Sequence, residues 1–167
     1  HADILTLDTE GRVLRDAAMA ISEGTITAMG EIPVDFQADE TVDATGHIVM
    51  PGLFNAHTHS AMTLFRGYAE DLPLDRWLNE RIFPVESALT ADDVYWGASL
   101  AAAEMIRGGT VGFADHYFHM DRVAQVAAES GLRANLAWCM FGREEGEIGA
   151  DLAAIAAFTE QWQGAAG

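Results

Sequence analysis

The sequence predicts an α/β fold in which a small strand-rich segment precedes a series of alternating strands and helices. Residues 1–50 consist of short apolar runs separated by glycine-containing turns, a pattern typical of a small β-sheet. From residue 47 onward, short apolar runs of strand length alternate with longer runs that have helical periodicity. This alternation favours parallel βαβ units. Half of the 167 residues are hydrophobic, which suits a globular chain with a packed core.

The first fifty residues predict three short strands, over residues 4–7, 13–21 and 25–29, before a longer apolar run that begins at His47. Turns containing Asp, Glu, Ser and Gly separate these strands. A sheet of this size has one apolar face that needs a cover. We therefore expect it to be part of a larger assembly of strands or to pack against another segment.

The rest of the chain predicts alternating elements with local start and stop signals. Thr90 and Asp93 have the spacing of a capping box, and Gly108 and Gly131 follow the last residues of two helical patterns. The expected elements are a strand from His47 to Ala56, a short helix over 74–83, a helix over 91–107, a strand over 110–115, a helix from Asp121 to Ser130, a strand over 132–140, a polar loop over 142–149 and a helix from Asp151 to Trp162.

The triplet His57-Thr58-His59, at the end of the apolar run, is the strongest functional signal in the sequence. Residues two apart on a strand point to the same side, so an extended triplet presents two imidazoles side by side, as a metal ion requires. On a helix the two rings would diverge. Because zinc usually takes three or four protein ligands, the sequence predicts that further ligands come from elsewhere.

Other polar residues near the strand ends have structural interpretations. His116 and His119 follow the strand predicted over 110–115, and we interpret them as structural histidines, with a pocket-lining role as the alternative. Asp115 is expected to be buried and hydrogen-bonded to the backbone of a neighbouring strand. His47 is expected to be structural.

The charge of the chain excludes several classes of partner. Twenty-six acidic residues face nine basic residues, and the net charge is −17, which argues against nucleic acid or an anionic membrane. There is no apolar stretch long enough to span a bilayer. One cysteine, Cys139, excludes an internal disulfide framework and favours a reducing, cytoplasmic location. Since the chain does not begin with Met, we expect residues before His1.

Several segments resemble the amidohydrolase superfamily. Residues 51–67, PGLFNAHTHSAMTLFRG, resemble its first barrel strand and the loop that follows. Residues 71–86 and 108–118 resemble the branch that contains 5′-methylthioadenosine/S-adenosylhomocysteine deaminases and triazine chlorohydrolases. The resemblance implies that residues 1–50 are part of a small β-sandwich domain, and that residues 51–167 are the first three βα units of a (β/α)₈ TIM-type barrel that is truncated here.

The resemblance also implies a site. His57 and His59 would be ligands of one divalent metal ion, zinc or alternatively iron, and Glu86 would accept hydrogen bonds from the ribose hydroxyls of a small-molecule substrate. In the family, two further His, a proton-shuttling Glu and an Asp come from later strands, and this sequence has no counterparts of them. We therefore expect no catalytic residue in this segment, and no activity from it alone. Only Arg143 is available to meet a charged homocysteine-type tail.

Three functional hypotheses remain open. The leading one is hydrolytic deamination of an adenosine-type nucleoside, 5′-methylthioadenosine or S-adenosylhomocysteine, in which a metal-activated water attacks C6 and ammonia leaves. The second is a triazine- or guanine-type aminohydrolase or chlorohydrolase. The third is an inactive half-barrel fragment that acts as a binding or assembly module, because open strand edges tend to pair. A homo-oligomer is compatible with all three.

Overall fold

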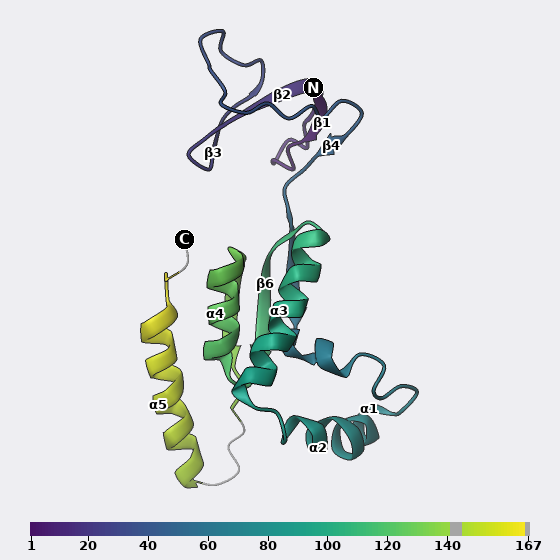
Figure 1. Ribbon diagram of the computed structural model, residues 1–167, viewed down its shortest axis with the longest axis vertical. Helices are drawn as coiled ribbons and strands as arrows, with labels where there is room; N and C mark the ends of the chain where they lie inside the picture. Colours follow the sequence, from purple (N-terminus) through teal and green to yellow (C-terminus); the bar gives the residue numbers. More distant parts are fainter. Residues whose placement is uncertain (141–144, 166–167) are drawn as a thin grey trace. The chain divides into compact units, whose positions relative to one another are not determined.

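The computed structural model describes residues 1–140 and 145–165 (Figure 1). It divides into two compact units, His1–Gly52 and Leu53–Gly167. In the described residues the first unit contains strands and the second contains strands and helices, so the expectation of a mixed α/β chain is confirmed. No helix in the described ranges is both long and apolar enough to cross a membrane.

The first unit is built on a four-stranded sheet. Its strands lie in the order β3-β2-β1-β4; β1 and β2, like β2 and β3, are antiparallel, and β1 and β4 are parallel. Ile4, Ala17 and Ala20 are buried, which gives this thin sheet a small apolar core. The three strands predicted for residues 4–29 are confirmed. The bounds are β1 (Ala2–Leu5), β2 (Val13–Ser22), β3 (Thr25–Gly30) and β4 (Ile48–Val49).

The prediction of one continuous strand from His47 to Ala56 is wrong. The apolar run is divided into β4, which pairs in the first unit, and β5 (Leu53–Thr58), which pairs in the second. Pro51 and Gly52 lie between them. Proline has no backbone N–H to donate to a strand ladder and glycine weakens a strand, so this dipeptide ends one sheet before the next begins.

The second unit contains a three-stranded parallel sheet in the order β5-β6-β7. β6 (Thr110–Tyr117) is central, β7 (Arg133–Trp138) lies at one edge, and α3 (Ala91–Arg107) and α4 (Met120–Ser130) precede and follow β6 along the chain. The two helices pack against each other and against the sheet (Figure 1). The predicted parallel βαβ units are therefore confirmed.

The core of this unit lies between the sheet and the helices. Val94, Phe113, Met120 and Val123 are fully buried there. The last helix, α5 (Glu145–Trp162), brings Phe158 edge-on to the ring of Trp138 on β7, with the ring centroids 5.5 Å apart. Helix α5 therefore covers the same core as α3 and α4.

Helix α3 approaches the segment that follows β5 closely. A Cβ at Gly97 would lie 2.5 Å from the carbonyl oxygen of Ala61, in the 3₁₀ segment η1 (Ser60–Phe65). The Thr63 hydroxyl also donates a hydrogen bond to the Gly97 carbonyl, at 2.7 Å. Helix α3 and η1 are therefore in close backbone contact directly after His59 in the chain.

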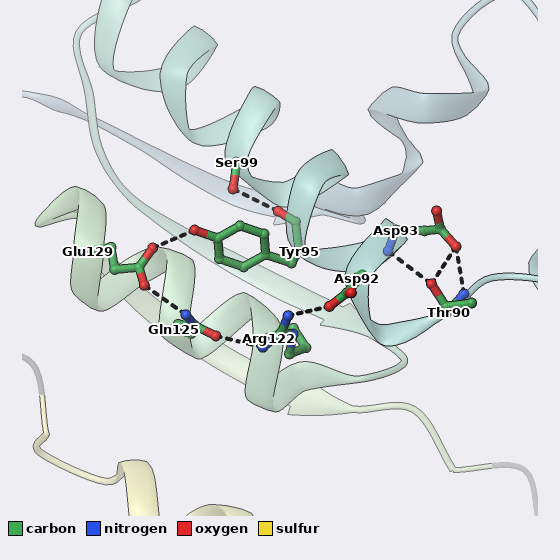
Figure 2. Close-up of polar contacts among 8 residues, drawn as sticks. All are labelled: Thr90, Asp92, Asp93, Tyr95, Ser99, Arg122, Gln125 and Glu129. Carbon is green, nitrogen blue, oxygen red and sulfur yellow. Dashed lines mark hydrogen bonds and ion pairs between the residues drawn. The ribbon is translucent and has the colours of Figure 1, made fainter.

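The predicted capping box of α3 is confirmed (Figure 2). The Asp93 backbone N–H donates to the Thr90 hydroxyl oxygen at 3.2 Å, and the Thr90 backbone N–H donates to the Asp93 carboxylate at 2.8 Å. The helix ends at Arg107 and is followed by Gly108 and by Gly109, whose φ is +77°. Local sequence signals set both ends of this helix.

Two other helix starts differ from expectation. Helix α4 begins at Met120 with His119, at φ 50°, as its N-cap, so Asp121 lies in the first turn instead of capping it. There its negative charge favours the positive end of the helix dipole. Helix α5 begins at Glu145 and not at Asp151, so the expected loop over 142–149 is wrong for residues 145–149. Residues 141–144 lie outside the described ranges.

The short helix expected over 74–83 is longer and contains a wide turn. It consists of α1 (Leu74–Arg76), the π-helical η2 (Trp77–Ile82) and α2 (Phe83–Glu86). The Phe83 N–H donates to the Leu78 carbonyl, five residues back. The ring of Pro84 would clash with the carbonyl four residues earlier in a regular helix, and the wide turn relieves this conflict. The continuation places Glu86 at the C-terminal end of the helical segment.

Candidate active site

The two predicted metal ligands lie side by side at the C-terminal end of β5. The ring centroids of His57 and His59 are 5.1 Å apart and the ring planes meet at 78°. His59 Nδ1 donates to the backbone carbonyl of His116 at 2.6 Å, which leaves its Nε2 available. Metal-ligating histidines usually donate their second ring N–H to such an acceptor. The pair therefore offers two neighbouring imidazoles, the side-chain type that binds zinc, and the hydrogen bond fixes which nitrogen of His59 stays available.

A complete metal site does not form within the described residues. No group of three or more His, Cys, Asp or Glu side chains is arranged there to hold a metal ion. The ring of His116 lies 6.2 Å from that of His59 and is exposed. The two imidazoles fit a metal such as zinc as part of a ligand set, and the set needs further members.

Asp115 fixes the backbone next to His59. It is 3% exposed, and its carboxylate accepts hydrogen bonds from the Ser60 backbone N–H, at 3.2 and 3.3 Å, and from the Ser60 hydroxyl. Burial raises the pKa of the Asp115 carboxyl, although the hydrogen bonds from Ser60 oppose the shift. The expectation that Asp115 is buried is confirmed, but its backbone partner is Ser60 in η1, two residues after the end of β5, and not a residue of the strand itself.

Glu86, the predicted ribose ligand, is linked to the histidine pair by one residue, Tyr117. The Tyr117 hydroxyl donates to Glu86 Oε1 at 2.8 Å, and the Tyr117 ring centroid is 6.2 Å from that of His59. Burial and the hydrogen bond to Glu86 raise the pKa of the Tyr117 hydroxyl, so it remains a donor at neutral pH. Sequence reasoning missed Tyr117. Its signal was the period-two pattern that it shares with the buried Phe113 and Asp115.

A cavity of about 330 Å³ connects these groups. His59, Glu86 and Tyr117 contribute polar atoms to it, and most of its other walls are apolar. Such a volume and lining suit a small organic ligand. Burial raises the pKa of the Cys139 thiol, which also lines it. The remaining lining residues are Met62, Trp77, Leu78, Ile82, Phe83, His116 and Phe118.

A second cavity, of about 400 Å³, shares Phe83, Glu86 and Phe118 with the first. His119 and Trp138 belong to its wall. The structure thus places His116 at one cavity and His119 at the other, in line with the pocket-lining alternative. Arg143, expected to face a substrate tail, lies outside the described residues.

Comparison with known proteins establishes the family. The model of the amidohydrolase family matches residues 48–166. The chain belongs to the amidohydrolase family. This confirms the resemblance carried by residues 51–67, 71–86 and 108–118.

Individual relatives in the amidohydrolase family agree with this assignment. The chain is 54% identical over 151 residues to a 5-methylthioadenosine/S-adenosylhomocysteine deaminase of Desulforudis audaxviator, covering 89% of this chain and 35% of that protein. It is 48% identical over 169 residues to a 5′-deoxyadenosine deaminase of Methanosarcina acetivorans, covering 99% and 38%. A crystal structure of an adenosine deaminase from Xanthomonas campestris with bound zinc matches with a TM-score of 0.76 and 34% identity, covering 97% and 40%.

The chain covers less than half of each of these three proteins. It spans between 35% and 40% of their length. The described residues therefore correspond to one part of the relatives, and the remaining parts of those proteins have no counterpart in this sequence.

Proposed function

We propose that this chain carries the N-terminal part of a metal-dependent hydrolase that deaminates an adenosine-type nucleoside. The observation that carries the proposal is that His59 and Glu86 line one cavity at the C-terminal end of a parallel sheet, with the ring of His57 beside that of His59. In β/α barrels, active sites form at that end of the strands. The names of the relatives, which are deaminases of adenosine-type nucleosides, support the same reaction.

We propose for both segments of the chain the fold that the sequence predicts. Residues 1–50 would be part of a small β-sandwich domain, and residues 51–167 the first three βα units of a (β/α)₈ barrel. The parallel order β5-β6-β7 supports this. Leu53 and Phe54 on the edge strand β5 are more than half exposed in the described structure, as expected of strand residues that further strands of a barrel would cover.

The proposed cofactor is one divalent metal ion, zinc, with iron as the alternative. The zinc in the Xanthomonas campestris structure supports zinc. His57 and His59 would hold the ion, His59 through Nε2 because its Nδ1 is engaged. When bound, such an ion supplies a water molecule of lowered pKa. Asp115 contributes by fixing the chain at Ser60, and therefore the position of His59.

The proposed substrate class is a ribonucleoside of adenine with an altered 5′ position. Glu86 offers a carboxylate oxygen to the ribose diol, and the aromatic walls from Trp77, Phe83 and Phe118 suit a purine ring. Water replaces the amino group at C6, so that nucleoside and water give an inosine-type nucleoside and ammonia. The chain offers a single Arg after β7, Arg143, which favours an uncharged 5′ tail such as a methylthio group over a homocysteine tail.

The test is an ammonia-release assay on the protein expressed from its complete gene. We expect turnover of 5′-deoxyadenosine and 5′-methylthioadenosine, loss of metal and activity together on chelation, and a raised KM in Glu86→Ala. Turnover of guanine or of an aminotriazine with no dependence on Glu86, or release of chloride from a chlorotriazine, would instead support the second hypothesis. A folded, metal-free product that turns over none of these compounds would support the inactive binding module.

The remaining proposals concern the cellular setting. The net charge of −17 argues against nucleic acid or an anionic membrane as partner, and the names of the relatives support a small-molecule substrate. The free thiol of Cys139 is compatible with the reducing environment of the cytoplasm. A native mass spectrum of the whole protein, compared with a denatured one, measures the chain length, the bound metal and any homo-oligomer together.

A further inference from the structure

We propose that Tyr117 is a positioning residue that holds the Glu86 carboxylate at a fixed distance from the His57–His59 pair, and so sets recognition of the ribose diol. This inference rests on the proposed function, because it assigns a role within the same site. It adds a residue that sequence reasoning did not single out.

Tyr117 lies between the two halves of the site, the histidine pair and Glu86. Its ring lies beside His59, with centroids 6.2 Å apart and planes at 37°, and its hydroxyl donates to Glu86 Oε1 at 2.8 Å. One rigid aromatic side chain therefore spans the gap between the histidine pair and the carboxylate. This hydrogen bond joins α2 to the end of β6.

Tyr117 is held more firmly by its surroundings than Glu86 is. Tyr117 is 3% exposed, its carbonyl accepts a hydrogen bond from the Cys139 N–H at 2.8 Å, and it is in register with Trp138. Glu86 is only partly buried and ends a helix of four residues. The long Glu side chain loses much rotamer entropy when it is ordered. The more deeply buried Tyr117 therefore orients the less buried Glu86.

As a result, the Glu86 carboxylate is already oriented before the ligand binds. Tyr117 engages Oε1, and within the described residues Oε2 accepts no hydrogen bond from protein. Preorganisation lowers the cost of binding, because the side chain is already ordered when the ligand arrives. Removing the Tyr117 hydroxyl should therefore weaken recognition of the diol while leaving the chemistry at C6 largely intact.

The decisive experiment compares two nucleosides with Tyr117→Phe in the complete protein. For 5′-deoxyadenosine we expect kcat/KM to fall roughly tenfold, mainly through KM, which is the loss typical of one hydrogen bond to a charged group. For the analogue that also lacks the 2′- and 3′-hydroxyls, we expect a change of less than about twofold, since Glu86 has no diol to hold.

The matched control is Tyr95→Phe. Tyr95 also donates its hydroxyl to a glutamate, Glu129, at 2.7 Å, on the surface between α3 and α4 (Figure 2). It lines neither of the two cavities. We expect this variant to retain the kcat and KM of the unmodified protein for both nucleosides.

A double variant provides a second test in case Tyr117→Phe alone does not fold. In Glu86→Ala with Tyr117→Phe no carboxylate is left without its donor, and removing both partners of a hydrogen bond is often nearly neutral for stability. If Tyr117 acts through Glu86, the double variant should match Glu86→Ala alone in KM for 5′-deoxyadenosine. An additive loss in the double variant would overturn the positioning role.

Two further outcomes separate this inference from the function on which it rests. Equal losses for both nucleosides in Tyr117→Phe would mean a merely structural role and would overturn the inference, while the proposed deaminase remains. Absence of turnover of any adenosine-type nucleoside by the unmodified complete protein would overturn the proposed function, and the positioning role with it.

Discussion

The second unit contains the same hydrogen bond in two different environments. Tyr117 donates to Glu86 at 2.8 Å at the C-terminal end of the sheet, and Tyr95 donates to Glu129 at 2.7 Å on the helical surface. Tyr117 is 3% exposed and adjoins His59, whereas the Tyr95 pair is exposed to solvent. Both bonds join a tyrosine hydroxyl to a glutamate, so any difference in their roles comes from burial and from the groups that lie beside them.

The surface pair belongs to a network that joins α3 and α4. The guanidinium of Arg122 lies 5.1 Å from the centre of the Tyr95 ring and contacts Asp92 and Gln125 (Figure 2). The pKa of the Glu129 carboxyl is lowered by hydrogen bonds from Gln125 and Tyr95. Exposed pairs of this kind contribute little to stability. This network is therefore expected to tolerate substitution, while the buried set at the sheet end is not.

The largest expected effect is on activity, at His59. If the metal proposal is right, His59→Asn should lose bound metal and reduce ammonia release to background, because a metal site needs all of its protein ligands. The control is His47→Asn, since His47 is exposed in the first unit and contacts the carbonyl of Thr45. Metal analysis by mass spectrometry and the ammonia assay measure both variants. Full metal content in His59→Asn would contradict the assignment.

The next effect is on stability, at Asp115. Asp115→Ala should lower the free energy of unfolding by about 3 kcal/mol, because it leaves the buried Ser60 N–H without its acceptor and opens a small cavity. Asp92→Ala is the surface counterpart, and we expect no measurable change from it. Urea denaturation of both variants decides between them. Equal losses would remove the contrast between the two regions.

A third test concerns the close packing of α3. Gly97→Ala should destabilise the protein by about 1–3 kcal/mol, since the new Cβ would lie 2.5 Å from the Ala61 carbonyl oxygen. Gly108→Ala is the control within the same segment, because the nearest atom to its Cβ is 3.4 Å away. Thermal melting of the two variants should separate them clearly. A stable Gly97→Ala would show that η1 shifts freely.

The smallest effect sharpens the comparison itself. Tyr117→Phe leaves the partly buried Glu86 without its donor, so we expect a loss of about 1 kcal/mol in the free energy of unfolding. Tyr95→Phe should leave the unfolding curve unchanged, because water replaces the lost donor at Glu129. Both curves can be measured in urea under identical conditions. A larger loss in Tyr95→Phe would reverse the ranking of the two regions.

Signals that act over a few residues determined much of this protein. The capping box at Thr90 and Asp93, the glycine stop after α3 and the alternation of strands and helices were all readable in the sequence. So was the His57–His59 pair, because its spacing places both rings on one side of an extended chain. These features depend on neighbours one to four residues away, and such neighbours are fixed by the sequence itself.

The tertiary structure decided what distant residues do to one another. The hydrogen bond from Tyr117 to Glu86 joins residues 31 positions apart, and the one from Ser60 to Asp115 joins residues 55 positions apart. The division of the apolar run at Pro51-Gly52 likewise depended on which sheet each half pairs with. The sequence indicated that Asp115 would be buried, and it did not indicate its partner. Such pairings follow from the packing of α2, α3 and β6, in which each side chain takes the partner that the folded chain brings within reach.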